Sequence, residues 1–309
     1  MNLRLHAQFL REPGHPPLFV RQVTPEAPRA WVLFLHGSLV HSEYYLPWAL
    51  ALASEGFGVW LPDLRGHGRS GGPRGTVQAY TDYLADIRRL VDAMQAETDR
   101  LPLYLGGESF GGLLAFLAAQ EPLPLEGLVL SAPAFALQAS LSPALRRAIA
   151  WGSMLVPGLR SLRPMGINGV SGHPDLPAIV RTDSLAIHRY PLRFLGELLA
   201  AQDAAIQGAS AVSPPLLVML GGADRVVDHR VTRQVLTQVP GPVEIHEYPE
   251  AHHALTGDYA EILAATVATF TSRVVPGTLA WKSGASGTGR AESGVPRAWG
   301  WIHATDPGR

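Results

Sequence analysis

The segment Gly107-Glu108-Ser109-Phe110-Gly111 lies between two apolar runs, 101–105 before it and 112–117 after it. The first run is typical of a buried strand and the second of a buried helix. A serine on so tight a strand-to-helix turn adopts a strained backbone, and small residues at 107 and 111 avoid clashes around it. The context therefore predicts a nucleophile elbow. The alternative is a glycine-rich turn with a capping serine, because the chain has 32 glycines.

Strand-like and helix-like segments alternate along most of the chain. Residues 80–94 carry apolar side chains at i, i+3, i+4 and i+7, which indicates an amphipathic helix. The predicted strands are residues 3–10, 18–23, 31–35, 58–61, 102–106, 127–131, 216–220 and 243–248. This alternation predicts an α/β fold with a mostly parallel eight-stranded sheet and helices on both faces.

The alternation stops between residues 134 and 212, where the sequence is rich in proline and no strand is evident. We expect this segment to form a helical cap over the site, the alternative being a helical subdomain without substrate contact. Residues 1–133 and 213–275 then form the core. Residues 276–309 show no periodicity and are expected to be a disordered tail. The alternative is that tryptophans in the tail mark a binding segment.

The composition narrows the possible functions. The chain has 309 residues, no cysteine and a net charge of −1. Disulfides and thiol catalysis are therefore excluded, and the charge gives no reason to expect nucleic acid or an anionic membrane as partner. No apolar run is long enough for a membrane span, and residues 1–10 lack a signal-peptide core, so we expect a cytoplasmic protein. The 12 histidines show no metal-ligand spacing, and no cofactor is expected.

A serine nucleophile needs a base, and the base needs an acid to orient it. In this kind of sheet the catalytic groups follow the strands, in the order serine, acid, histidine. Asp224 directly follows the strand 216–220, whereas Asp228 is explained more simply as a helix N-cap. The loop after the last strand offers both His252 and His253, which spacing does not separate, while His246 lies inside the strand.

An oxyanion formed at the serine needs two hydrogen-bond donors. The backbone N–H of Phe110, directly after the serine, is one candidate. The second should come from the turn after the strand 31–35, at the backbone N–H of Ser38.

Taken together, these residues resemble the α/β-hydrolase superfamily, and within it the monoacylglycerol lipase/lysophospholipase group of serine aminopeptidase-like hydrolases. The resemblance covers residues 5–273. It implies Ser109 as nucleophile, Asp224 as acid and, through the stretch 249–255, His253 as base. The stretches that carry it are His36-Gly37-Ser38, His41-Ser42-Glu43-Tyr44-Tyr45, Gly56-Phe57-Gly58-Val59 and residues 63–75.

Two positions depart from the pattern of this group. Monoacylglycerol lipases often carry Gly-Glu where this chain has Leu39-Val40, and some carry arginine at the position of Tyr44. The resemblance associates those polar residues with the glycerol head group, so the head group stays open here. We expect Glu108, Leu39 and Tyr44 to contact the substrate.

The resemblance implies a serine hydrolase that cleaves small-molecule carboxylic esters with an apolar acyl chain through an acyl-enzyme. The helical cap is expected to touch membrane or micelle surfaces transiently. The oligomeric state is left open. The alternatives are a thioesterase, acyltransferase or C–C hydrolase with the same triad, and a catalytically silent scaffold. Haloalkane dehalogenase chemistry would need a carboxylate in place of Ser109.

Overall fold

A single eight-stranded sheet organises the chain. The computed structural model describes residues 2–98, 100–139, 141–161 and 169–274. The strands lie in the order β1-β2-β4-β3-β5-β6-β7-β8, with antiparallel pairing only at β1–β2 and β2–β4. The predicted mostly parallel sheet is therefore confirmed. The strands are β1 (Leu3–Leu10), β2 (Leu18–Pro25), β3 (Ala30–Leu35), β4 (Phe57–Pro62), β5 (Leu103–Glu108), β6 (Gly127–Ser131), β7 (Leu216–Gly221) and β8 (Val243–Tyr248).

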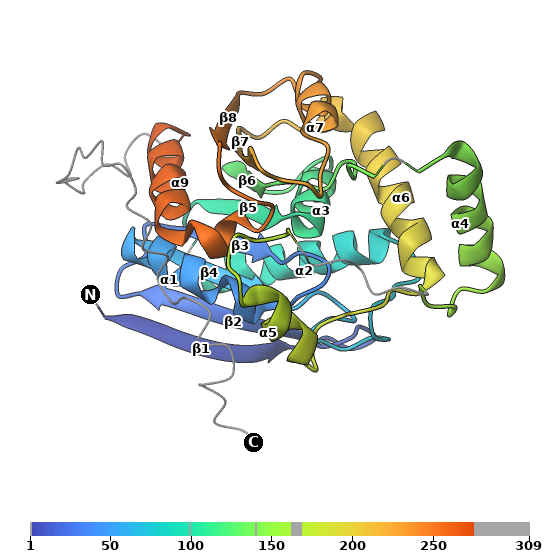
Figure 1. The fold of residues 1–309 in the computed structure, drawn as a ribbon. Coiled ribbons are helices and arrows are strands. Elements are labelled where there is room, and N and C mark those ends of the chain that lie inside the picture. Colours follow the sequence, from blue (N-terminus) through green and yellow to red (C-terminus); the bar gives the residue numbers. More distant parts are fainter. Residues whose placement is uncertain (1, 99, 140, 162–168, 275–309) are drawn as a thin grey trace.

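Helices cover both faces of this sheet (Figure 1). The α-helices are α1 (Leu46–Ser54), α2 (Thr81–Glu97), α3 (Phe110–Ala118), α4 (Pro143–Leu155), α5 (Leu176–Thr182), α6 (Leu192–Gln207), α7 (His229–Leu236), α8 (Leu255–Asp258) and α9 (Ala260–Val274). Two short 3-10 helices, η1 (Ser42–Tyr45) and η2 (Ala209–Ala211), complete the described elements. Within the described ranges, no helix combines the length and apolarity needed to cross a bilayer.

Two apolar cores lie on opposite faces of the sheet. On one face, Trp48 of α1 and Phe270 of α9 pack against the sheet. On the other, Tyr83 of α2, Phe116 of α3 and Val235 of α7 do so. Strands β3 to β7 are buried along their whole length, as expected of parallel strands covered on both sides. This double layer fixes the carboxyl ends of the strands, where the candidate residues follow.

The helices α4, α5 and α6 come from the segment between β6 and β7, in which the sequence predicted no strand. In the described part of this segment, residues 134–139, 141–161 and 169–212, the only β pairing is in two isolated bridges, Leu137 with Val227 and Arg160 with Pro191. Helix α6 packs against α3, and α4 lies outside α6, away from the sheet (Figure 1). The predicted tail, residues 276–309, lies outside the described residues.

Candidate active site

Ser109 lies on the turn between β5 and α3 with φ +57° and ψ −116°, angles that L-residues rarely adopt. A Cβ added to Gly107 would lie 2.4 Å from the carbonyl carbon of Gly111. One added to Gly111 would lie 2.1 Å from the carbonyl oxygen of Leu35. Both glycines are thus required by close backbone packing, and the predicted strained strand-to-helix turn is confirmed.

Asp224 follows β7 and accepts a hydrogen bond from Nδ1 of His253 over 2.8 Å. Its other oxygen accepts from the backbone N–H groups of Val226 and Val227 at 2.6 and 3.2 Å. Burial would raise the pKa of Asp224, but hydrogen bonds from His229 and His253 hold it well below its usual range. Because the carboxylate is ionised, Nδ1 of His253 carries its proton and Nε2 is the nitrogen that can accept another.

The structure separates the alternatives that sequence spacing left open. Of the adjacent histidines, His253 contacts Asp224, whereas the ring of His252 lies beside Gly172 of the inserted segment. Asp228 accepts a hydrogen bond from the backbone of Arg230 at 3.0 Å and caps α7, so the N-cap prediction is confirmed.

The turn after β3 passes directly against the elbow, since a Cβ on Gly37 would lie 3.7 Å from Cβ of Ser109. His36 holds this turn. Its Nε2 accepts from the backbone N–H of Leu64 at 2.9 Å, so Nδ1 carries the proton and donates to the carbonyl of Gly37 at 2.7 Å. Burial and the neighbouring His67 lower the pKa of His36 to about 3, which keeps the ring neutral.

One cavity of about 120 Å³ connects these parts. Ser38, Ser109, Phe110 and His253 all line it, but Asp224 does not, because it lies behind the imidazole. The remaining wall is mainly apolar and includes side chains of the inserted segment. These are Leu137, Val170, Leu176 of α5 and Leu198 of α6. The cavity therefore brings the candidate nucleophile, base and oxyanion turn together beneath apolar side chains.

Both the sequence and the fold of this chain are similar to those of known proteins. The family model for serine aminopeptidase, S33, matches residues 26–260. The chain belongs to this family. It is 30% identical to a monoacylglycerol lipase of Mycolicibacterium smegmatis, over 74% of this chain and 83% of that protein. It is also 30% identical to a phospholipase of Bacillus subtilis, over 66% of this chain and 79% of that protein.

Solved structures show the same fold. A soluble variant of monoglyceride lipase from Saccharomyces cerevisiae, in complex with a substrate analogue, aligns with a TM-score of 0.77. The alignment has 16% sequence identity and covers 87% of this chain and 96% of that chain. This chain is therefore an α/β hydrolase of the serine aminopeptidase (S33) family.

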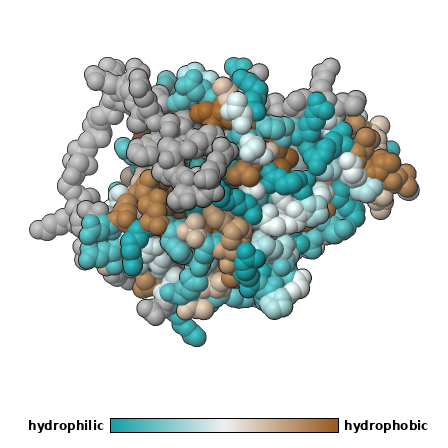
Figure 2. All heavy atoms as spheres, turned by 90° about the horizontal axis from the view of Figure 1, so that it is seen from below, coloured by the Kyte–Doolittle hydropathy of each residue, from teal (hydrophilic) through white to brown (hydrophobic). Residues whose placement is uncertain are grey.

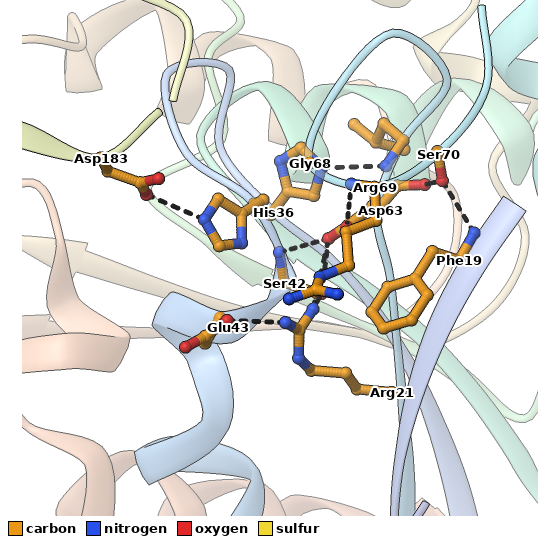
Figure 3. A network of polar contacts seen from close by, with 12 residues as sticks. Phe19, Arg21, His36, Ser42, Glu43, Asp63, Gly68, Arg69, Ser70 and Asp183 are labelled. Carbon is orange, nitrogen blue, oxygen red and sulfur yellow. Dashed lines mark hydrogen bonds and ion pairs between the residues drawn. The ribbon is translucent and has the colours of Figure 1, made fainter. Parts of the chain in front are cut away.

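In this family member, a buried carboxylate ties together the loops beside the site. Asp63 accepts hydrogen bonds from the backbone of Ser42 at 2.8 Å, from its hydroxyl at 2.5 Å and from the backbone of Arg69 at 2.7 Å. Figure 3 shows these donors converging on Asp63, with Arg21 alongside. Burial raises the pKa of Asp63, but the charges of His41 and Arg21 and the Arg69 N–H outweigh it and lower the pKa.

A second buried carboxylate joins the inserted segment to the core of this hydrolase. Asp183 follows α5 and accepts from Nε2 of His41 and from the hydroxyl of Tyr44, both at 2.9 Å. Figure 3 shows Asp183 joining this network from a separate part of the chain. His67, in the loop after β4, contacts the carbonyl of Arg65 and the hydroxyl of Tyr190.

Leu39, Tyr44 and Glu108, the expected substrate contacts, all line the cavity. The hydroxyl of Tyr44 already donates to Asp183. Glu108 is 4% exposed and accepts hydrogen bonds from the protein itself. Among the residues that the structure describes, no three metal-binding side chains gather.

Sequence reasoning missed several polar residues that contact these groups, among them Tyr45, Thr256 and His229. Tyr45 and Thr256 each bind Glu108, and His229 binds Asp224. A signal existed only for His229, which is the first residue of the helix after Asp224. Neither Tyr45 nor Thr256 stands out in its local sequence, and the contacts of both join segments that are distant in the chain.

Proposed function

We propose that this protein is a serine hydrolase of the monoacylglycerol lipase/lysophospholipase type, which cleaves carboxylic esters with an apolar acyl chain. The observation that carries the proposal is the Asp224–His253 hydrogen bond of 2.8 Å, with His253 and Ser109 lining one apolar cavity. The names of the relatives support the ester substrate, because they include monoacylglycerol lipase and phospholipase.

The proposed reaction proceeds through an acyl-enzyme. Ser109 attacks the ester carbonyl while Nε2 of His253 takes the hydroxyl proton, and Asp224 stabilises the imidazolium that forms. The backbone N–H groups of Ser38 and Phe110 donate to the oxyanion. His253 then protonates the leaving alcohol, after which a water molecule attacks the acyl-enzyme by the same steps.

The acyl chain is assigned to the apolar wall of the cavity. Leu176 and Leu198 belong to the inserted segment, so residues 134–212 act in this proposal as the cap over an acyl site. Leu39 and Tyr44 also line the cavity, and of these two side chains one is apolar and the other has a hydroxyl that is already hydrogen-bonded. An apolar acyl group is therefore recognised more strongly than a polyhydroxyl head group.

Contact with a lipid surface is a further part of the proposal. Six large apolar side chains of α4 and the turn after it are exposed, namely Leu145, Trp151, Met154, Leu155, Val156 and Leu159. Figure 2 shows apolar surface at the end of the molecule where α4 lies. An exposed patch of this size is unusual on a protein that meets only water.

A cytoplasmic location stays a prediction from the sequence.

Hydrolysis of a p-nitrophenyl ester series from acetate to palmitate tests the function, with Ser109→Ala as the control. We expect turnover that peaks at medium or long chains and falls by at least about 10³-fold in Ser109→Ala, as is typical when a nucleophile is removed. Monoacylglycerol and lysophospholipid then identify the head group. A peak at acetate would contradict the apolar acyl site.

Labelling with a fluorophosphonate separates the remaining alternatives. Labelling of Ser109 without ester turnover would favour a thioester or an acyl acceptor other than water. Absence of both labelling and turnover would indicate a silent scaffold.

A further inference from the structure

We propose that Glu108 is a positioning residue that fixes the elbow, the oxyanion turn and the loop of His253 relative to one another. The inference rests on the proposed function, because it assigns a role within that same site. It replaces the expectation that Glu108 contacts the substrate. Glu108 lies directly before Ser109, and its carboxylate hydrogen-bonds to the last residue of β6 and to segments that follow β3 and β8.

One arm of the network reaches the loop of the base. Oε2 of Glu108 accepts from the backbone N–H of Thr256 at 3.0 Å and from its hydroxyl at 2.9 Å. Thr256 is 1% exposed and follows His253 by three residues, in α8. The hydroxyl of Ser131, at the end of β6, donates to the same oxygen at 3.0 Å. The position of His253 relative to the elbow therefore depends on Glu108.

The other arm reaches the oxyanion turn. The hydroxyl of Tyr45 donates to Oε1 of Glu108 at 3.2 Å and accepts from the backbone N–H of Gly37 at 2.9 Å. Gly37 directly precedes Ser38, whose N–H is the proposed oxyanion donor. The peptide between His36 and Gly37, one before the peptide that carries the Ser38 N–H, is thus held by a hydrogen bond whose acceptor is itself bound to Glu108.

The set of partners fits an ionised carboxylate. Ser131, Tyr45 and both donors of Thr256 all present hydrogens to Glu108. Burial raises the pKa of Glu108, but the hydrogen bonds of Thr256 and the charge of His253 act against this rise. The interaction is reciprocal, so a charged Glu108 stabilises the imidazolium that forms on His253 during reaction.

A substrate contact fits these distances less well. Oε2 already accepts three hydrogen bonds, and a substrate hydroxyl at Oε1 would have to share that oxygen with Tyr45. A positioning role predicts a loss in kcat, whereas a substrate contact predicts a rise in KM.

Three variants test the arms separately. The variant Glu108→Gln keeps the shape of the side chain, because its amide oxygen can face Thr256 while its NH₂ group faces Tyr45. It removes the negative charge of the carboxylate. We expect kcat to fall about 10-fold and the acid limb of the kcat/KM profile to move down by roughly half a pH unit, because His253 loses a stabilising charge. Tyr45→Phe and Thr256→Val should each lower kcat about 3- to 10-fold with little change in KM.

Matched controls come from buried side chains of the same types. Tyr83→Phe removes a buried hydroxyl for which the described residues offer no hydrogen-bond partner, and Thr232→Val changes a buried threonine of α7. Both should keep the kcat of the wild type. Thermal unfolding of every variant identifies those that do not fold, and the remaining variants then carry the test.

The outcomes distinguish this inference from the proposed function. A wild-type protein without ester turnover or fluorophosphonate labelling would overturn the proposed function itself. An active wild type whose three variants keep its kcat and pH profile would overturn the role of Glu108. A rise in KM at unchanged kcat would also overturn it, because that result assigns Glu108 and Tyr45 to substrate binding.

Discussion

At the scale of single residues, Asp224 binds a second imidazole that the catalytic scheme does not use. Nε2 of His229 lies 3.2 Å from the same Oδ2 that accepts from His253. The side chain of His229 is 18% exposed and begins α7, directly after the N-cap Asp228. Because two donors share one oxygen, the hydrogen bond from His229 draws charge away from the bond to His253.

Replacing His229 by alanine should therefore change the basicity of His253. Without the competing donor, Asp224 stabilises the imidazolium of His253 more strongly. We expect the acid limb of the kcat/KM profile to move up by roughly 0.3 to 0.5 pH units, opposite in direction to the shift in Glu108→Gln. The profile is measured with a soluble p-nitrophenyl ester.

His246→Gln is the control for this measurement, because His246 contacts Glu244 on β8 and not Asp224. Its acid limb should stay at the position of the wild type. A profile of His229→Ala that is unchanged or moves to lower pH would refute the competition between the two histidines.

At the scale of elements, helix α4 carries its apolar side chains toward solvent on one side and packs against α6 on the other. Trp151, Met154 and Leu155 are 65%, 69% and 74% exposed. An isolated apolar residue at the surface needs no explanation, but a continuous group on one helix indicates a partner surface. The proposed partner is the lipid that contains the substrate.

The double variant Met154→Gln/Leu155→Gln tests this contact. Burial of each apolar side chain in lipid contributes roughly 1.5 kcal/mol, so the variant should bind phosphatidylcholine vesicles at least about 10-fold more weakly in a flotation assay. Turnover of a soluble short-chain ester should not change. Ile262→Gln, at a 47% exposed position of α9, is the matched control. Equal flotation of all three proteins would show that α4 does not bind lipid.

At the scale of the whole molecule, two neutral histidines are enclosed between the loops that follow β3 and β4. Burial and its neighbour His67 lower the pKa of His36 to about 3. Burial is also the main reason that the pKa of His67 falls to about 4. In the unfolded chain each ring has a pKa near ~6.5.

Acidification should destabilise this protein before its carboxylates titrate. A pKa lowered by folding contributes stability that is complete above the unfolded value near ~6.5 and is lost as the pH falls toward the folded value. Each ring contributes a slope of up to about 1.4 kcal/mol per pH unit. Urea midpoints measured at pH 7, 6 and 5 should therefore decrease, although the raised pKa of Glu108 opposes part of the loss.

His67→Gln isolates this effect, because one of the two titrating rings is removed. The dependence of its urea midpoint on pH should be flatter than that of the wild type. His188→Gln, at an exposed position, should leave the slope unchanged. Equal slopes in the wild type and His67→Gln would mean that the buried ring does not control acid stability.

Much of the fold could be predicted from the sequence, because its signals are local. Uninterrupted apolar runs such as 31–35 indicate strands covered on both faces, and the glycines at 107 and 111 indicate a backbone too crowded for side chains. The preference for Asp224 over Asp228 is equally local, since one follows a strand and the other begins a helix.

The contacts within the site required the tertiary structure, because they join residues far apart in the chain. Spacing alone cannot separate His252 from His253; the resemblance implies His253, and the fold shows that its ring meets Asp224. Glu108 meets Thr256 across 148 positions of sequence, and His41 meets Asp183 across 142. The sequence determined the strands, the helices and the elbow through local backbone sterics and burial. Tertiary structure decided which polar groups share one buried site, because buried hydrogen bonds depend on distances in space.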